Sequence, residues 1–327
     1  MDTLDSTYLD TVHEVYAEAA AAPQPALCCT QSPVWKLPGL VVPQGMLDRN
    51  YGCGTTVNPH DLADAKRVLY VGVGAGMEAL QLAYFVREPG GVVAVDTNRA
   101  MLDVAAEQMA EAAQTNAWFD PSYVDLREGD ALNLPIESES VDVAAQNCLF
   151  NIFTREHLTQ ALAEMHRVLR PHGRFVLSDP VAERPMPAHL AADARLRAEC
   201  LSGALLLDDY LAALVEAGFG TIEVRARRPY RLLDKRRYGL EENLLLESVE
   251  VAAIKDPVPA DGPCIFTGRT AIYVGEDDAW DDGKGHFFTR DIPLGVCDKT
   301  AGALSSLGRD DLVVTASTWH YPGDGCC

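Results

Sequence analysis

Apolar and amphipathic segments alternate regularly between residues 61 and 182. Apolar runs separated by glycine- or proline-bearing turns predict five strands, at 68–71, 92–96, 123–128, 141–146 and 174–179. The segments between them carry hydrophobic positions with a helical period. Because each strand is a near-continuous apolar run, the pattern predicts a mostly parallel sheet with helices on both faces, an α/β fold.

The N-terminal part of the chain has a different pattern. Residues 6–20 predict an amphipathic helix with Leu9, Val12 and Tyr16 on one side. A stretch rich in proline and glycine, from Pro23 to about Pro59, follows this helix and predicts loops that run over a scaffold. We expect residues 1–60 to form an arm that helps to close the crevice of the sheet.

The C-terminal half continues the alternation. The helix predicted at 156–170 ends at Pro171 and Gly173. Further helices are predicted at 188–200, 207–217, 235–254 and 298–308, and strands at 221–228, 265–275 and 312–318. Segment 265–275 is expected to be the closing antiparallel edge of the sheet, with Cys264 opening it. The predicted units are an arm, a central domain, a segment with closing strands and a C-terminal domain that also covers the crevice: 1–60, 61–182, 183–275 and 276–327.

Composition narrows the possible functions. The 327 residues carry a formal net charge of −21, which argues against nucleic-acid binding because phosphates would be repelled. No apolar run reaches the roughly 18–20 residues that span a bilayer, and the acidic N-terminus lacks the features of a secretion signal. Nine cysteines without any C-x-x-C spacing favour a reducing cytoplasm over a disulfide framework or a structural zinc site. The chain is expected to be a monomer.

A glycine turn marks a candidate ligand site. Gly72, Gly74 and Gly76 follow a strand and open a helix, where glycines let a backbone approach a ligand closely. The third glycine comes one residue too early for the dinucleotide form, which disfavours a nicotinamide or flavin cofactor. Asp96 ends the second strand, where a carboxylate can hold ribose hydroxyls. Asp130 follows the third strand and can reach the edge of a base.

Together these features resemble the class I S-adenosylmethionine-dependent methyltransferases over about residues 61–182. The resemblance implies that the three glycines line the methionine part of the donor. It implies that Asp96 and the adjacent Thr97 hold the ribose, that Asp130 and Ala131 flank the adenine, and that Asn147 lies near the amino-acid end.

Three cysteines indicate the acceptor. Cys148 follows the fourth strand, where such domains bring a substrate to the donor, and Cys53 and Cys200 lie in flanking segments that can fold over the same crevice. Methylating oxygen or nitrogen generally needs a positioned base, and none is evident. Trivalent arsenic needs no base, because its lone pair can attack the methyl group while three thiolates hold the atom.

The sequences YGCG, NC and ECLSGAL around these cysteines are similar to the arsenite methyltransferase family, in its microbial branch associated with arsenosugar synthesis. The resemblance implies that Cys53, Cys148 and Cys200 bind As(III) and that Tyr51 lies against the donor. The implied enzyme is an arsenite methyltransferase (EC 2.1.1.-, 2.1.1.137). Its implied partners are arsenite or its glutathione conjugates and the reductants glutathione and thioredoxin.

Of the six other cysteines, four form two pairs of adjacent residues. Cys28-Cys29 and Cys326-Cys327 can chelate soft ions, and we expect them to relay arsenic inward or to resolve a disulfide formed during turnover. Two other functions stay open: a methyltransferase for a quinone, sterol or other carbon acceptor, and a metalloid-binding protein without catalysis. Cys264 and Cys297 are expected to be structural.

Overall fold

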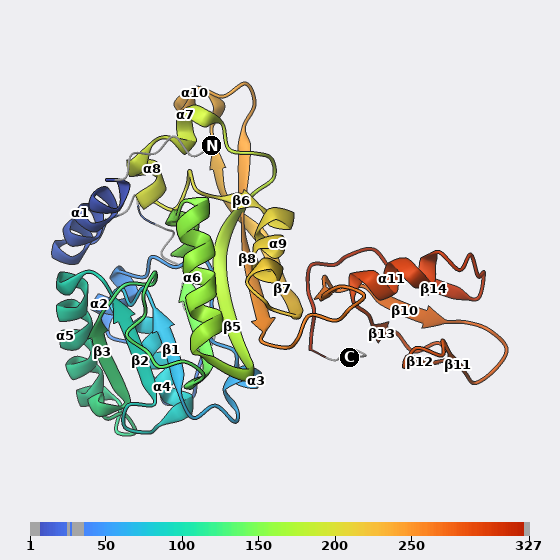
Figure 1. Ribbon diagram of the computed structural model, residues 1–327. Coiled ribbons are helices and arrows are strands. Elements are labelled where there is room, and N and C mark those ends of the chain that lie inside the picture. Colours follow the sequence, from blue (N-terminus) through green and yellow to red (C-terminus); the bar gives the residue numbers. More distant parts are fainter. Residues whose placement is uncertain (1–6, 25–26, 28–35, 324–327) are drawn as a thin grey trace.

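A computed structural model describes residues 7–24, 27 and 36–323 of the chain (Figure 1). Its centre is a nine-stranded sheet with the order β3-β2-β1-β4-β5-β8-β7-β9, and β6 pairs with β5. The first five strands of this order are parallel to one another. Strand β8 is antiparallel to both of its neighbours, β5 and β7, and β9 is parallel to β7. The strands are β1 Val68–Val71, β2 Val92–Asp96, β3 Val124–Glu128, β4 Val141–Asn147, β5 Leu169–Ala182, β6 Leu205–Leu206, β7 Thr221–Leu233, β8 Leu244–Ile254 and β9 Cys264–Phe266.

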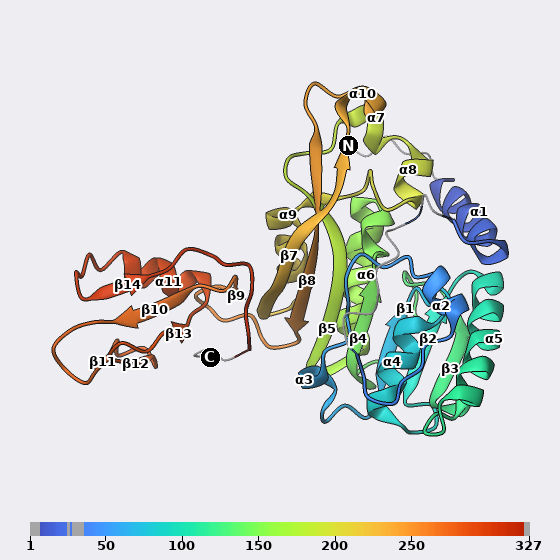
Figure 2. The same ribbon diagram turned by 180° about the vertical axis from the view of Figure 1, so that it is seen from behind.

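Helices cover both faces of this sheet. One face packs against α6 (Arg155–Val168) and α9 (Leu207–Glu216), and the other packs against α4 (Met77–Val86) and α5 (Arg99–Thr115). Successive residues of β1 belong alternately to the two cores, as expected for a strand buried on both sides. Figure 2 shows the α4 side. The predicted mostly parallel sheet with helices on both faces is confirmed.

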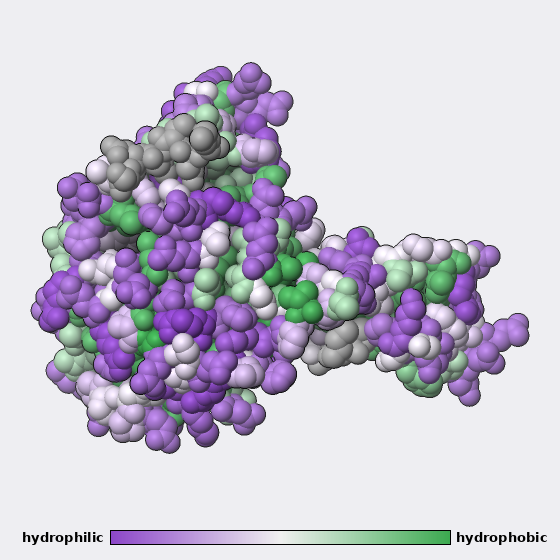
Figure 3. All heavy atoms as spheres, viewed as in Figure 1, coloured by the Kyte–Doolittle hydropathy of each residue, from purple (hydrophilic) through white to green (hydrophobic). Residues whose placement is uncertain are grey.

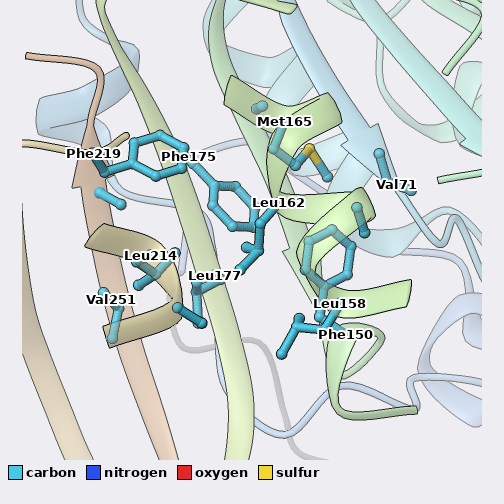
Figure 4. Close-up of a cluster of buried hydrophobic side chains, with 14 of the residues drawn as sticks. Val71, Phe150, Leu158, Leu162, Met165, Phe175, Leu177, Leu214, Phe219 and Val251 are labelled. Atoms are coloured by element: carbon cyan, nitrogen blue, oxygen red, sulfur yellow. The ribbon is translucent and has the colours of Figure 1, made fainter. Parts of the chain in front are cut away.

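The larger core lies between β5 and the helices α6 and α9. Phe175 on β5 packs between Phe150 and Phe219, with ring centroids 5.5 Å and 6.1 Å away (Figure 4). Leu162 and Met165 of α6 complete this fully buried group. Aromatic rings of this size dominate the free energy of core packing, and here they fix α6 and α9 to the sheet.

Shorter elements complete the main body. The N-terminal helix α1 (Tyr8–Ala21) lies across the top of the parallel strands, next to α5 and α8 (Figure 1). The remaining helices, all short, are α2 Gln44–Asp48, α3 Pro59–Leu62, α7 Ala188–Ala191, α8 Ala194–Ala198 and α10 Lys235–Tyr238, with 3-10 turns at Pro121–Tyr123 and Phe150–Ile152. None of the helices in the described part of the chain is both long and apolar enough to cross a membrane.

A smaller lobe follows β9. It contains β10 (Thr270–Tyr273), β13 (Leu294–Gly295) and β14 (Leu312–Val314) in one sheet, the hairpin β11 (Ala279–Asp281) and β12 (Phe287–Thr289), and α11 (Asp298–Ser305). The lobe projects from the β9 edge, away from α1 (Figures 1 and 2). Hydrophilic residues dominate the face of the molecule in Figure 3, in keeping with the charge of −21.

Three predictions from the sequence are wrong. The helix predicted over 235–254 ends at Tyr238, and 244–254 is β8, which lies between β5 and β7. Its leucines, glutamates and alanines suit a helix in isolation, but pairing on both edges and the alternating burial of residues 244–247 favour a strand. Segment 265–275 splits into β9, which is parallel to β7, and β10 of the lobe. The described C-terminal residues lie at the far edge of the sheet rather than over the crevice.

Candidate active site

The main cavity, of about 320 Å³, opens at the carboxyl ends of the parallel strands. Ligands of open α/β sheets bind at this edge, where loops rather than strands line the space. Nine of the residues predicted to bind donor or acceptor line it: Tyr51, Gly72, Gly74, Asp96, Thr97, Asp130, Ala131, Asn147 and Cys148.

The glycine turn between β1 and α4 forms the floor of the cavity. Gly72 and Gly74 have φ values of +80° and +52°, which residues with a side chain rarely adopt. A Cβ atom on Gly74 would meet no atom within 4 Å and would project into open space. Gly76 does not line the cavity. A Cβ atom there would lie 2.8 Å from Cε of Met109, so this glycine allows α4 to pack closely on α5.

Two acidic residues lie at the rim. The Asp96 carboxylate accepts hydrogen bonds from the backbone N–H groups of Val73 (2.8 Å) and Asn98 (2.9 Å). Burial raises the pKa of Asp96, and these N–H groups partly oppose the rise. Asp130 accepts from the N–H of Leu132. Both carboxylates are thus held in place by backbone donors, with the cavity beside them.

The roof of the cavity is α1. Its lining residues include Leu9, Val12 and Tyr16, the three residues of the predicted apolar stripe. The helix is held in place by Asn98, whose side-chain amide donates to the carbonyl of His13 (3.1 Å). The stripe is therefore directed at a ligand site as well as at the core.

Glu78, at the start of α4, is a buried carboxylate beside the glycine turn. It accepts hydrogen bonds from the N–H (2.9 Å) and hydroxyl (2.8 Å) of Thr56 and from the hydroxyl of Tyr70 (3.0 Å). Burial raises its pKa, and these donors together with the Asn147 side chain oppose the rise. The sequence analysis missed Glu78. The available signal was a charged residue inside the apolar run that follows the glycines.

Asn147 fixes the loop that carries Cys53. Its side-chain oxygen accepts from the N–H of Cys53 (3.0 Å), and its side-chain nitrogen donates to the carbonyl of Gly54 (3.0 Å). A Cβ atom on Gly52 would lie 2.6 Å from this amide, so only glycine fits the approach. Because Asn147 also immediately precedes Cys148, one residue positions two of the predicted ligands.

The three predicted arsenic ligands lie in one buried cluster. Cys53, Cys148 and Cys200 share it with Tyr51 and residues of α1, and Cys148 alone of the three lines the cavity. The Cys200 thiol donates to the carbonyl of Cys148 (3.0 Å) and lies 3.8 Å from the Tyr16 hydroxyl. Within the described residues, no three His, Cys, Asp or Glu side chains converge closely enough to hold a metal ion. The three cysteines are thus neighbours in one cluster, but their sulfurs do not converge on one point.

Two of these cysteines have strained backbones. The φ values of Cys148 and Cys200 are +61° and +59°, in the left-handed region. A residue with a side chain occupies this region at a cost of about 1–3 kcal/mol, and such residues gather at functional sites. Each conformation is held by other parts of the fold: the N–H of Cys148 donates to the carbonyl of Ser178 (2.7 Å), and Asn151 donates to the carbonyl of Cys200 (2.9 Å).

Residues in the second half of β5 contact the same cysteines or their neighbours. The Ser178 hydroxyl lies 3.4 Å from the sulfur of Cys53. The next residue, Asp179, is fully buried and accepts hydrogen bonds from Gln146 and Tyr210, each 2.6 Å long. Gln146 in turn accepts from the N–H of Leu149, just after Cys148. The sequence analysis did not single out this group, because polar residues at a strand end carry no distinctive spacing.

The adjacent pairs Cys28-Cys29 and Cys326-Cys327 lie outside the described residues. The neighbouring residue Leu27 is described, and it is buried in the cluster that contains the three predicted ligands.

The comparisons with known proteins agree with this geometry. Residues 51–235 match a family model described as a methyltransferase domain. The chain is 33% identical over 177 residues to an arsenite methyltransferase of Halobacterium salinarum, covering 54% of this chain and 43% of that protein. It is 31% identical over 215 residues to an arsenite methyltransferase of Aquipseudomonas alcaligenes, covering 63% and 60%. The chain therefore spans about half of the length of these relatives.

One solved structure is similar over most of the chain. It is described as an arsenic(III) S-adenosylmethionine methyltransferase from Chlamydomonas reinhardtii, with a TM-score of 0.59 and 25% identity. The likeness covers 92% of this chain and 99% of that one. The predicted resemblance to arsenite methyltransferases is confirmed.

Proposed function

This chain belongs to the methyltransferase-domain family, and we propose that it transfers methyl groups from S-adenosylmethionine to trivalent arsenic held by Cys53, Cys148 and Cys200. The observation that carries the proposal is the burial of these three thiols in one cluster, directly beside the cavity of the glycine turn. The similarity to proteins described as arsenite methyltransferases supports it.

The donor of this family is S-adenosylmethionine, and the cavity suits it. The open space over Gly74 leaves room for the methionine part, while the anchored Asp96 can accept from two ribose hydroxyls. Asp130 and Ala131 line the same cavity, and we expect them to flank the adenine. When bound, this cofactor would supply an electrophilic methyl group, and the lone pair of arsenic would form the As–C bond and leave S-adenosylhomocysteine. Arsenic would thereby rise formally to the pentavalent state, and two thiols closing a disulfide would supply the two electrons that return it to the trivalent state.

Holding arsenic requires the thiols to turn toward one another. Cys200 would exchange its hydrogen bond to the carbonyl of Cys148 for an As–S bond. That bond to the carbonyl is a weak S–H donor contact, so its loss costs little. Cys148 and Cys200 lie in one cluster with residues of α1, and the Cys200 sulfur lies 3.8 Å from the Tyr16 hydroxyl.

The chain's own residues would accelerate the transfer by alignment. Asn147 and Ser178 position Cys53, and Tyr16 and Tyr51 lie beside the thiol cluster on the α1 side. Fixing reacting groups in a productive geometry contributes up to several kcal/mol to a rate. The lone pair of arsenic removes the need for a base, although His13 also lines the cavity.

The remaining cysteines would act before or after this step. We expect Cys28 or Cys29, tethered beside the buried Leu27, to receive arsenite or its glutathione conjugate. Cys326 and Cys327 would relay arsenic or resolve a disulfide, with glutathione or thioredoxin as the reductant. A role in the first step of arsenosugar synthesis belongs to the same proposal.

Serine replacements test the ligand set. Cys53→Ser, Cys148→Ser and Cys200→Ser should each abolish methylation of arsenite, while calorimetric binding of S-adenosylmethionine is retained. Gly302→Ala is the control: an added Cβ atom there meets nothing within 4 Å, so this variant should leave methylation unchanged. If all three ligand variants still methylate arsenite at the wild-type rate, the assignment fails.

The two other candidate functions give different products. A methyltransferase for a quinone or sterol would ignore arsenite and would be insensitive to thiol blockers. A metalloid-binding protein would retain arsenite and release no S-adenosylhomocysteine. Incubation with arsenite, donor and glutathione, followed by speciation of the arsenic, separates all three.

A further inference from the structure

Two cysteines outside the three-cysteine cluster, Cys264 and Cys297, lie where the main sheet meets the C-terminal lobe. Cys264 is the first residue of β9, and Cys297 immediately precedes α11. Both are in one buried cluster with Phe266 and Tyr321, and neither forms a disulfide. We infer that Cys264 and Cys297 form a two-thiol site for a trivalent arsenical that has two exchangeable bonds. The identity of the metalloid rests on the proposed function.

The fold brings the two residues to the same face of β9. Side chains alternate along a strand, so Cys264 and Phe266 share one face while Ile265 packs against the main core on the other. Helix α11 of the lobe packs over β9 and delivers Cys297 to that face. Residues 33 positions apart in the sequence, one from each part of the molecule, therefore meet in one cluster.

A salt bridge joins the segment before Cys264 to the helix that follows Cys297. The Lys299 ammonium donates to Asp261 (2.6 Å) and to the carbonyl of Gly262 (2.8 Å). Because Asp261 lies three residues before Cys264 and Lys299 lies two residues after Cys297, these contacts hold the two cysteine-bearing segments together. Cys297 also lies at the N-terminus of α11, where the helix favours negative charge.

The number of thiols selects the ligand. An arsonous compound, R–As(OH)₂, has one As–C bond and two bonds that exchange. With two cysteines it forms two As–S bonds and releases two water molecules, and arsenic stays trivalent, so no oxidant or reductant is needed. Arsenite has three exchangeable bonds and suits the three-thiol cluster. A two-thiol site therefore suits the singly methylated product in its trivalent form.

A second cavity, of about 250 Å³, borders the thiol cluster. Thr55–Asn58 and His320–Gly323 are among the segments that line it. Tyr321 lines this cavity and stacks on Phe266 of the thiol cluster, with ring centroids 4.5 Å apart. Tyr321 is thus the residue at which the cavity meets the thiol cluster, and neither cysteine lines the cavity itself.

Peptide mapping of the wild-type chain tests the site without any substitution. The full protein is treated with phenylarsine oxide in the presence of excess glutathione and then digested with trypsin. Cys264 lies in the tryptic peptide 256–269 and Cys297 in 291–299, each as the single cysteine. One phenylarsenic group should bridge these two peptides. Recovery of the peptides unmodified, or joined directly as a disulfide, would overturn the inference.

Variants supply the second measurement. Cys264→Ser or Cys297→Ser should each lower retention of the bridging group about tenfold or more, because one thiol lacks the effective concentration of a chelating pair. The double variant should bind one arsenic atom fewer per chain than the wild type. A loss of two arsenic atoms per chain would mean that the two cysteines bind arsenic at separate sites. Cys53→Ser is the control and should keep the bridge. A bridged pair in a chain that does not methylate arsenite would refute the proposed function alone, and methylation without a bridge would refute only this site.

Discussion

Replacing Glu78 by alanine and by glutamine separates the loss of its accepted hydrogen bonds from the loss of its buried charge. In the wild-type chain it accepts from two groups of Thr56 and from the hydroxyl of Tyr70, all buried. Glu78→Ala leaves these donors without an acceptor, and each unsatisfied donor costs about 1–3 kcal/mol. Partial relaxation of the hydroxyls brings the expected loss in the free energy of unfolding to about 3–5 kcal/mol.

Glu78→Gln should behave differently at neutral pH. The amide oxygen can still accept from the N–H of Thr56, and the amide N–H₂ can donate to the two hydroxyls once they rotate. The substitution also removes the cost of burying a charge, so the net change should stay within about 1 kcal/mol. Denaturant unfolding of both variants at pH 7 measures the contrast. If Gln costs as much as Ala, the hydrogen-bond reasoning is wrong.

The pH dependence gives an independent check. Burial raises the pKa of Glu78 above its ordinary value of 4.5. A raised pKa in the folded state means that its stabilising contribution is complete below 4.5 and is lost as the pH rises through the folded value. The stability of wild type relative to Glu78→Gln should therefore fall as the pH rises from 4.5 toward neutrality. A rise over that interval would refute the assigned direction.

Three further substitutions test the site and its scaffold. Asp96→Asn should weaken donor binding about 10- to 100-fold in calorimetry, because a charged acceptor contributes about 1.5–3 kcal/mol. Burial raises the pKa of Asp61, but Arg225 and Arg174 outweigh burial and lower this pKa below 3.8, so Asp61→Asn should cost about 3–5 kcal/mol at pH 7 by leaving the two arginines without their buried partner. This difference should vanish as the pH falls below 3.8 and through the lowered pKa of the folded state. Gly52→Ala should slow arsenite methylation about 10- to 100-fold by displacing the Cys53 loop, whereas the control Gly302→Ala, with open space around it, should leave the rate unchanged.

Most of the residues predicted to bind the donor line one cavity, because the sequence signals that single them out are local. Gly72 and Gly74 follow a strand and precede a helix, and Asp96 ends the next strand, so the topology of a parallel sheet suffices to bring them to one edge. The parts that were missed depend on tertiary contacts. Glu78 and Asp179 are ordinary acidic residues in the sequence, and only the fold reveals that both are buried acceptors.

The error at β8 has a similar origin. Segment 244–254 contains leucine, glutamate and alanine, which favour a helix, alongside valines that favour a strand. Two neighbours, β5 and β7, pair with it along most of its length, and this pairing outweighs the weak local preference. Strand β8 carries Glu250, whose carboxylate accepts hydrogen bonds from Arg228 of β7 and from the N–H of Thr55. The misassigned strand therefore also helps to hold the loop of Cys53.

Backbone strain separates the roles of the three central cysteines. Cys148 and Cys200 adopt left-handed conformations, whereas Cys53 does not and instead depends on Asn147 and on glycines at its two neighbours. If all three were only small apolar residues of the core, the fold would have no reason to maintain two strained conformations at about 1–3 kcal/mol each. A ligand role gives such a reason, because it fixes where the sulfur must be rather than how much volume it fills. Under the proposed function, the strained backbones of Cys148 and Cys200 and the hydrogen bonds of Asn147 to the Cys53 loop would be two different ways of fixing where a ligand sulfur lies.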